Sequence, residues 1–160
     1  MQCEPVGTDV ALVAGAALMA GVGKGADSDP APSPRKPITI LVADNDPILL
    51  MLIVESLTLS GYRVLGAENG SEALELARQH SGPIDLLLTD VLMPGMNGLE
   101  VAQGFASLYP EAKVLYMSGH TRDVPGVREV FEAHPDKFLV KPFWFDALVE
   151  KIQSLFPDEP

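Results

Sequence analysis

Asp90 is the residue whose surroundings point most directly to chemistry. It comes directly after the apolar run at residues 84–89, and a turn rich in proline, glycine and asparagine follows at residues 94–98. A carboxylate in such a place can act as a nucleophile, as a metal ligand or as both. The alternative is an ordinary turn or helix-capping acid, and the stretch around Asp90 leaves both interpretations open.

Other polar side chains follow apolar runs in the same way: Asp44, Asn45 and Asp46 after residues 38–43, Ser118 after residues 113–117, and Lys141 after residues 137–140. If these runs are parallel strands, their carboxyl ends meet at one edge of the sheet, around Asp90. Carboxylate oxygens suit Mg²⁺, and a metal ion with a lysine can neutralise charge on a transferred phosphoryl group. A carboxylate can accept that group as an acyl phosphate.

The elements that must position this set alternate between strands and helices along the chain. Strands are predicted at residues 38–43, 62–67, 84–89, 113–117 and 137–140, and helices at residues 47–60, 71–79, 99–109, 127–134 and 143–156. Asp46 is the candidate N-cap of the first helix, Pro47 its first residue, and Gly61 its stop signal. The alternation predicts an α/β fold with a doubly wound parallel sheet and helices on both faces.

Composition limits the classes of function. The chain has 160 residues, of which 47% are hydrophobic and 21% charged, which suits one domain with a real core plus a tail. The net charge of -11 argues against nucleic-acid binding, because phosphates attract lysine and arginine. The single cysteine, Cys3, allows no intramolecular disulfide and fits a reducing compartment, so we expect a cytoplasmic protein.

Residues 1–37 differ in composition from the rest. The apolar run at residues 10–23 is shorter than the roughly 20 residues that a membrane span needs. A signal peptide requires a lysine or arginine before its apolar run, and neither precedes this run. We therefore expect a disordered extension at residues 1–37 and one domain at residues 38–156. Since the chain stops near the end of the last predicted helix, no output domain is expected.

Four motifs, each at a predicted strand end, resemble the receiver domain of two-component response regulators. They are ILVADNDP (residues 40–47), DLLLTDVLMPGMNG (85–98), VLYMSG (114–119) and FLVKPF (138–143). The resemblance covers residues 38–156 and extends to the receivers of hybrid histidine kinases. It implies a flavodoxin-like (βα)5 fold with five parallel strands in the order 2-1-3-4-5.

The same resemblance implies roles for individual residues. Asp90 would be the phosphoacceptor, Ser118 the switch hydroxyl and Lys141 the lysine that contacts the phosphoryl group. Phe138 matches the switch aromatic, which is expected to turn inward on phosphorylation. The Lys141–Pro142 peptide bond is expected to be cis.

A Mg²⁺ site is implied as well, with four ligands: Asp44, Asn45, Asp90 and the backbone carbonyl of Leu92. Asn45 departs from the family pattern, which usually has a second acid at this position. An amide oxygen can bind a cation but carries no charge, so Mg²⁺ is expected to bind more weakly. Asp46 could substitute only if the loop shifted by one residue.

The function implied is that of a stand-alone receiver that accepts a phosphoryl group from a histidine kinase or a phosphotransfer protein. It would turn over no separate substrate, and it would signal to a protein partner through the surface formed by residues 127–134, 137–140 and 143–156. Nucleic acid and membranes are not expected as partners. The helix at residues 47–60 is unusually apolar, so Leu50 and Met51 are expected to help dock the phosphodonor. Crowded packing, or coverage by residues 10–23, is the alternative.

Two other functions remain open. One is a binding module of the same fold that works without phosphorylation, with Asn45 marking a weakened metal site. The other is a small phosphatase with an aspartyl nucleophile, although Leu92 stands where such enzymes usually have a second acid. Among the remaining residues, Gly95 and Gly98 are predicted to serve turns, and Trp144 and Phe145 to pack rather than to stack on a ligand.

Overall fold

The computed structural model describes residues 36–119 and 126–157. Five parallel strands form one sheet in the order β3-β2-β4-β5-β6, the 2-1-3-4-5 order expected. The strands are β2 (Thr39–Ala43), β3 (Arg63–Ala67), β4 (Leu86–Asp90), β5 (Lys113–Ser118) and β6 (Phe138–Val140). The helices are α1 (Pro47–Leu59), α2 (Gly70–Gln79), α3 (Gly98–Leu108), α4 (Val127–Ala133) and α5 (Phe145–Leu155), with a short 3₁₀ turn at Pro135–Lys137.

The predictions for residues 1–35 and 120–125 lie outside the described residues. No helix in the described ranges is long and apolar enough to cross a membrane.

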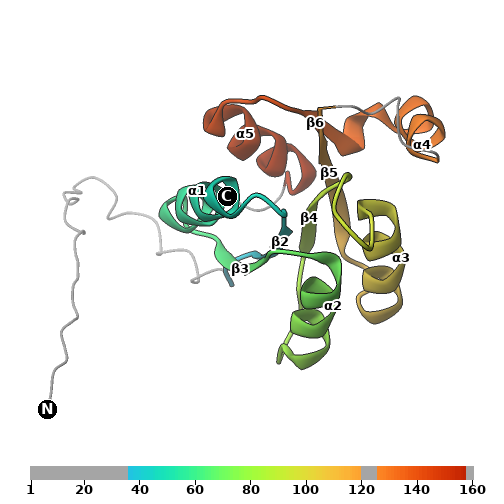
Figure 1. The fold of residues 1–160 in the computed structure, drawn as a ribbon. Coiled ribbons are helices and arrows are strands. Elements are labelled where there is room, and N and C mark those ends of the chain that lie inside the picture. The colour runs from blue at the N-terminus through green and yellow to red at the C-terminus, as the bar shows by residue number, and fades with distance from the viewer. Residues whose placement is uncertain (1–35, 120–125, 158–160) are drawn as a thin grey trace, which may run out of the picture. The chain divides into compact units, whose positions relative to one another are not determined.

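Helices cover both faces of the sheet, as the alternating pattern predicts (Figure 1). On one face, α1 and α5 pack over a core that includes Ile40, Ile53, Leu88 and Leu148. On the other face, α2, α3 and α4 pack over a second core that includes Phe105. Strand β4 lies in the middle of the sheet and is buried along its whole length, because it contributes side chains to both cores. This burial explains why its sequence is a continuous apolar run.

Strand register decides which polar residues meet. Ala43 of β2 pairs with Thr89 of β4, and Asp90 pairs with Met117 of β5. Asp44, which follows Ala43, therefore lies level with Asp90, and Ser118 lies one residue beyond it on the other side. All strands point the same way, so these groups share the carboxyl edge of the sheet.

Local signals place the start and end of α1 correctly. The side chain of Asp46 accepts hydrogen bonds from the backbone N–H groups of Ile48 (3.0 Å) and Leu49 (3.2 Å), and Pro47 is the first helical residue. Gly61 follows the helix with φ +99°, a conformation that favours glycine. These contacts confirm Asp46 as the cap of α1.

The prediction for Trp144 is wrong. This residue comes just before α5 and is 84% exposed, so it does not pack into the domain. Phe145, the next residue, is half-buried and packs against the α1–α5 core. Successive residues at a helix start point in different directions, so the apolar character of a neighbouring pair does not show which ring is buried.

Candidate functional site

Lys141 joins two acids at the carboxyl edge of the sheet. Its Nζ atom lies 2.9 Å from Oδ2 of Asp44 and 3.4 Å from Oδ2 of Asp90. Asp44 is fully buried and Asp90 nearly so, whereas Lys141 is partly exposed. The Lys141–Pro142 peptide bond is cis, as expected. Three side chains, one at the end of β4 and one just after each of β2 and β6, are thus brought together, although up to 97 residues separate them in the sequence.

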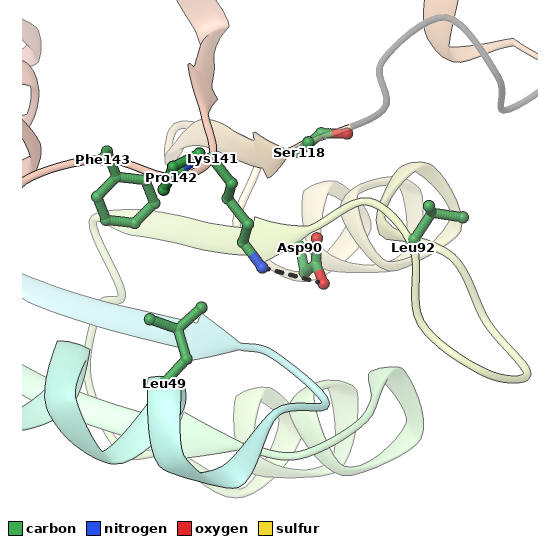
Figure 2. Close-up of a pocket in the computed structure, with 8 residues that line it drawn as sticks. Leu49, Asp90, Leu92, Ser118, Lys141, Pro142 and Phe143 are labelled. Carbon is green, nitrogen blue, oxygen red and sulfur yellow. Dashed lines mark ion pairs between the residues drawn. The ribbon is translucent and has the colours of Figure 1, made fainter.

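A cavity of about 470 Å³ opens beside Asp90. Asp90, Ser118 and Lys141 line it, together with Gly119 and four residues that contribute apolar surface: Leu49, Leu92, Pro142 and Phe143. Figure 2 shows Lys141 reaching toward Asp90, with Ser118 above them at the end of β5. The structure therefore places the acid, the lysine and the hydroxyl around one cavity.

Burial raises the pKa of Asp90. The positive charge and hydrogen bond of Lys141 lower it, the negative charge of Asp44 raises it, and the backbone N–H of Val91 lowers it, leaving a net rise. The position of Lys141 thus reduces the cost of keeping an ionised carboxylate in this buried site. An ionised Asp90 is the form that can attack an electrophile.

The oxygen ligands at this site fit Mg²⁺. They carry one negative charge fewer than they would with an acid at residue 45. Asp44 and Asp90 present carboxylates on adjacent strands, and carboxylate oxygens with several waters are the ligands Mg²⁺ prefers. Asn45 is exposed and does not line the cavity. Within the described ranges, no three His, Cys, Asp or Glu residues cluster closely enough to hold a metal. Both carboxylates are also paired with Lys141, and the weaker Mg²⁺ binding expected from Asn45 stays a prediction.

Replacing Asn45 with aspartate should tighten Mg²⁺ binding by about tenfold, because a third negative charge is added beside Asp44. Fluorescence titration of Mg²⁺ with both proteins measures this change, with Trp144 as the only tryptophan of the chain. Gln153→Glu, at an exposed position near the end of α5, adds the same charge at the opposite edge of the sheet and serves as the matched control. Equal affinities in the Asn45→Asp variant and the wild type would contradict this prediction.

Gly98 has a role that the sequence did not reveal. It is the first residue of α3 rather than a turn glycine, and a Cβ atom there would collide with the carbonyl oxygen of Asp90 and lie 2.9 Å from the Cα of Val91. Its N–H donates a hydrogen bond to the carbonyl of Val91 (2.9 Å). Gly95, by contrast, does serve a turn, with φ +81°. Close contact between α3 and the end of β4 therefore supports the backbone that carries Asp90.

Phe138 is already buried in this structure, with 5% of its surface exposed. Its ring stacks on Tyr116 (5.0 Å between centroids) and meets the edge of Phe131 of α4 (5.1 Å). An inward turn on phosphorylation would therefore have to start from another rotamer than the one seen here. The contact with Phe131 does link β6 to α4.

The expectation for helix α1 is wrong in part. Leu50 is only 8% exposed and packs in the same core as Ile53 and Leu57, so it cannot form part of an exposed strip. Met51 is 58% exposed, and Ile48 and Leu52 are exposed as well. The apolar run thus serves both a core and a surface, and the helical period decides which residue does which.

Comparison with known proteins agrees with this geometry. A sequence profile described as the response regulator receiver domain matches residues 40–153. The chain belongs to this family. The response regulator receiver protein CpdR of Brucella abortus is 33% identical over 117 residues, which cover 72% of this chain and 94% of CpdR. The crystal structure of the receiver domain from the hybrid histidine kinase CckA matches with a TM-score of 0.60 and 30% identity, over 72% of this chain and 96% of that one.

Receiver domains act in two-component signalling, and they typically carry a phosphoaspartate and use Mg²⁺. Larger proteins contain the same domain. The cyclic di-GMP phosphodiesterase of Thermotoga maritima is 34% identical over 115 residues, but these make up only 30% of its length. The activity in that name belongs to a protein of which this chain matches one part.

Proposed function

We propose that this receiver accepts a phosphoryl group on Asp90 from a histidine kinase or a phosphotransfer protein and signals by protein contact. The observation that supports it best is the grouping of Asp90, Lys141 and Ser118 around one cavity, with Nζ of Lys141 3.4 Å from the Asp90 carboxylate. A phosphate-independent binding module would need none of these three groups at the cavity. A phosphatase would need a second acid where the exposed side chain of Leu92 stands.

The chemistry is a displacement at phosphorus. A carboxylate oxygen of Asp90 forms a bond to phosphorus, and the bond from phosphorus to the donor breaks with its electron pair going to the donor. Lys141 can then hydrogen-bond a phosphoryl oxygen, and the Ser118 hydroxyl can donate to another. When bound, Mg²⁺ would neutralise charge on the phosphoryl oxygens, and its ligands would be Asp44, Asn45, Asp90 and the carbonyl of Leu92.

Incubation with acetyl phosphate and excess Mg²⁺, followed by intact mass, tests this proposal. The wild type should gain one phosphoryl group, and Asp90→Asn should gain none, because an amide is a poor nucleophile. Asp85→Asn is the matched control, since Asp85 lies at the opposite end of β4 and accepts a hydrogen bond from Thr39. A folded wild type that stays unmodified would favour the phosphate-independent binding module.

We propose further that the exposed apolar face at the start of α1 docks the phosphodonor. Met51 replaces the buried Leu50 as the residue to test. It lines a groove of about 490 Å³ with Val54, Gly66 and the acidic residues Glu55 and Glu68, among others. An exposed apolar strip next to a reactive group is a common mark of a protein contact site.

Met51→Glu should lower the phosphorylation rate by a protein donor about tenfold relative to the rate with acetyl phosphate, because a charge enters the apolar contact. The donor is a phosphotransfer protein chosen because it phosphorylates the wild type. Leu59→Glu is the matched control, at the far end of the same helix and 83% exposed. An unchanged ratio in Met51→Glu would remove Met51 from the docking surface.

The output surface is proposed to involve α4, β6 and α5. The aromatic contact between Phe138 and Phe131 connects β6 with α4, and α4 has only seven residues, so a small change in packing can shift it. The cytoplasmic location stays a prediction.

A further inference from the structure

The cavity beside Asp90 is larger and more apolar than transfer of a phosphoryl group requires. Of its polar groups, Nζ of Lys141 lies 3.4 Å from the Asp90 carboxylate, and Ser118 lies above this pair at the end of β5. Figure 2 shows Leu49 and Phe143 together on the side of Lys141 away from Asp90, while Leu92 lies on the opposite side of Asp90. A phosphoryl group held between Lys141 and Ser118 would leave the space along Leu49 and Phe143 free.

This apolar wall is held in place by its own contacts. The backbone N–H of Leu49 donates to the capping side chain of Asp46 (3.2 Å), which anchors the first turn of α1. The rings of Phe143 and Phe145 form a T-shaped pair, with 6.3 Å between centroids and an angle of 89°. Both Leu49 and Phe143 are half-buried against the α1–α5 core. A surface that is already ordered loses little entropy when a ligand covers it.

We propose that Leu49 and Phe143 form a subsite for the leaving group of the phosphodonor, with a preference for acyl phosphates that carry an apolar chain. The inference rests on the proposed phosphorylation of Asp90 and specifies the small-molecule donors of that same site. A chain of four carbons offers more apolar surface to this wall than the two carbons of an acetyl group do. The donor's phosphoryl end is bound by Lys141 and Ser118, and its chain by the two apolar residues.

The reaction balances without a further reactant. An Asp90 carboxylate oxygen bonds to the phosphorus of butyryl phosphate, the bond between phosphorus and the acyl oxygen breaks, and butyrate leaves with the electron pair. Acetyl phosphate reacts in the same way and releases acetate. Acetate and butyrate are nearly equal as leaving groups. A rate difference between the two donors therefore reports contact between the protein and the acyl chain rather than intrinsic reactivity.

The experiment compares the second-order rate constants for the two donors, by intact mass, with saturating Mg²⁺ and with Asp90→Asn as the blank. We expect butyryl phosphate to react about three to ten times faster, since two additional methylene groups become partly buried. A ratio near one, with acetyl phosphate still reacting, would overturn the subsite and leave the phosphorylation of Asp90 intact. Failure of both donors would overturn the phosphorylation itself and the subsite with it.

Two variants locate the subsite. Leu49→Asn should bring the ratio of the two rate constants close to one, whatever it does to each rate alone, because a polar amide replaces the apolar wall. Leu59→Asn carries the same substitution at an exposed position of the same helix and should keep the wild-type ratio. If folded Leu49→Asn keeps the wild-type ratio of the two rate constants, the acyl chain binds elsewhere and the subsite is overturned. Circular dichroism checks the fold, and Leu49→Ala gives a milder second test.

Discussion

Replacing Lys141 with methionine is expected to lower the free energy of unfolding at pH 7.5 by about 3 kcal/mol, measured by urea denaturation in EDTA. Asp44 is fully buried, and Lys141 lies 2.9 Å from it and 3.4 Å from Asp90. Among the described residues, Lys141 is the only cation paired with these two carboxylates, and removing one partner of a buried ion pair typically costs about 3–5 kcal/mol. The partial exposure of Lys141 places the expected value at the lower end.

The loss should depend on pH with a definite sign. Burial already raises the pKa of Asp90, and Lys141 is the main group that lowers it, so the variant should raise this pKa further. At pH values between the pKa of Asp90 in the unfolded state and its raised pKa in the folded state, the folded state binds more protons than the unfolded state. The free energy of unfolding therefore falls as pH rises through this window, and more steeply in the variant. Below the window the deficit should shrink, because the carboxyl becomes neutral.

Controls separate charge from packing. Lys137→Met makes the same substitution at an exposed lysine and should change the free energy of unfolding by less than about 0.5 kcal/mol. Adding Asp44→Asn to Lys141→Met should recover part of the lost free energy of unfolding, since one of the two negative charges that repel each other is removed. A deficit in Lys141→Met that stays constant across pH would contradict the electrostatic explanation.

Gly98→Ala is expected to lower the free energy of unfolding by about 3 kcal/mol. The added methyl group would meet the carbonyl oxygen of Asp90 and the Cα of Val91, which are backbone atoms of the central strand and the loop after it. Backbone cannot rotate away as a side chain can, so the start of α3 must shift, and such overpacking costs about 1–3 kcal/mol or more. The same shift should slow phosphorylation of Asp90, since it moves the backbone that carries the carboxylate.

Gly104→Ala is the matched control on the same helix. The three atoms nearest to a methyl group there all belong to the Leu74 side chain, which can move, and alanine is favoured over glycine in a helix interior by about 1 kcal/mol. The changes in the free energy of unfolding of the two variants, measured by urea denaturation, should therefore differ in sign or by at least 2 kcal/mol. If both variants are as stable as the wild type, α3 does not press on the backbone of Asp90.

Local patterns in the sequence were enough to predict every strand and helix of the described domain and their order along the chain. Continuous apolar runs predict strands that are buried on both faces, and Asp46, Pro47 and Gly61 mark the limits of α1 because capping depends on neighbouring residues. The positions of Asp44, Asp90, Ser118 and Lys141 followed from the same rule, since the carboxyl ends of parallel strands share one edge. Their individual roles came from the family resemblance.

Contacts between distant segments decided the rest. Leu50 and Met51 are adjacent and equally apolar, yet one is buried and the other exposed, because the helix turns by about 100° between them. The sequence predicts Gly98 to serve a turn, and only the close contact between the start of α3 and the end of β4 shows why glycine is needed there. The pairing of Lys141 with both acids, and the apolar wall of Leu49 and Phe143, depend on side chains from elements far apart in the chain. Local sequence signals carry no information on such distances, so only the tertiary structure decides them.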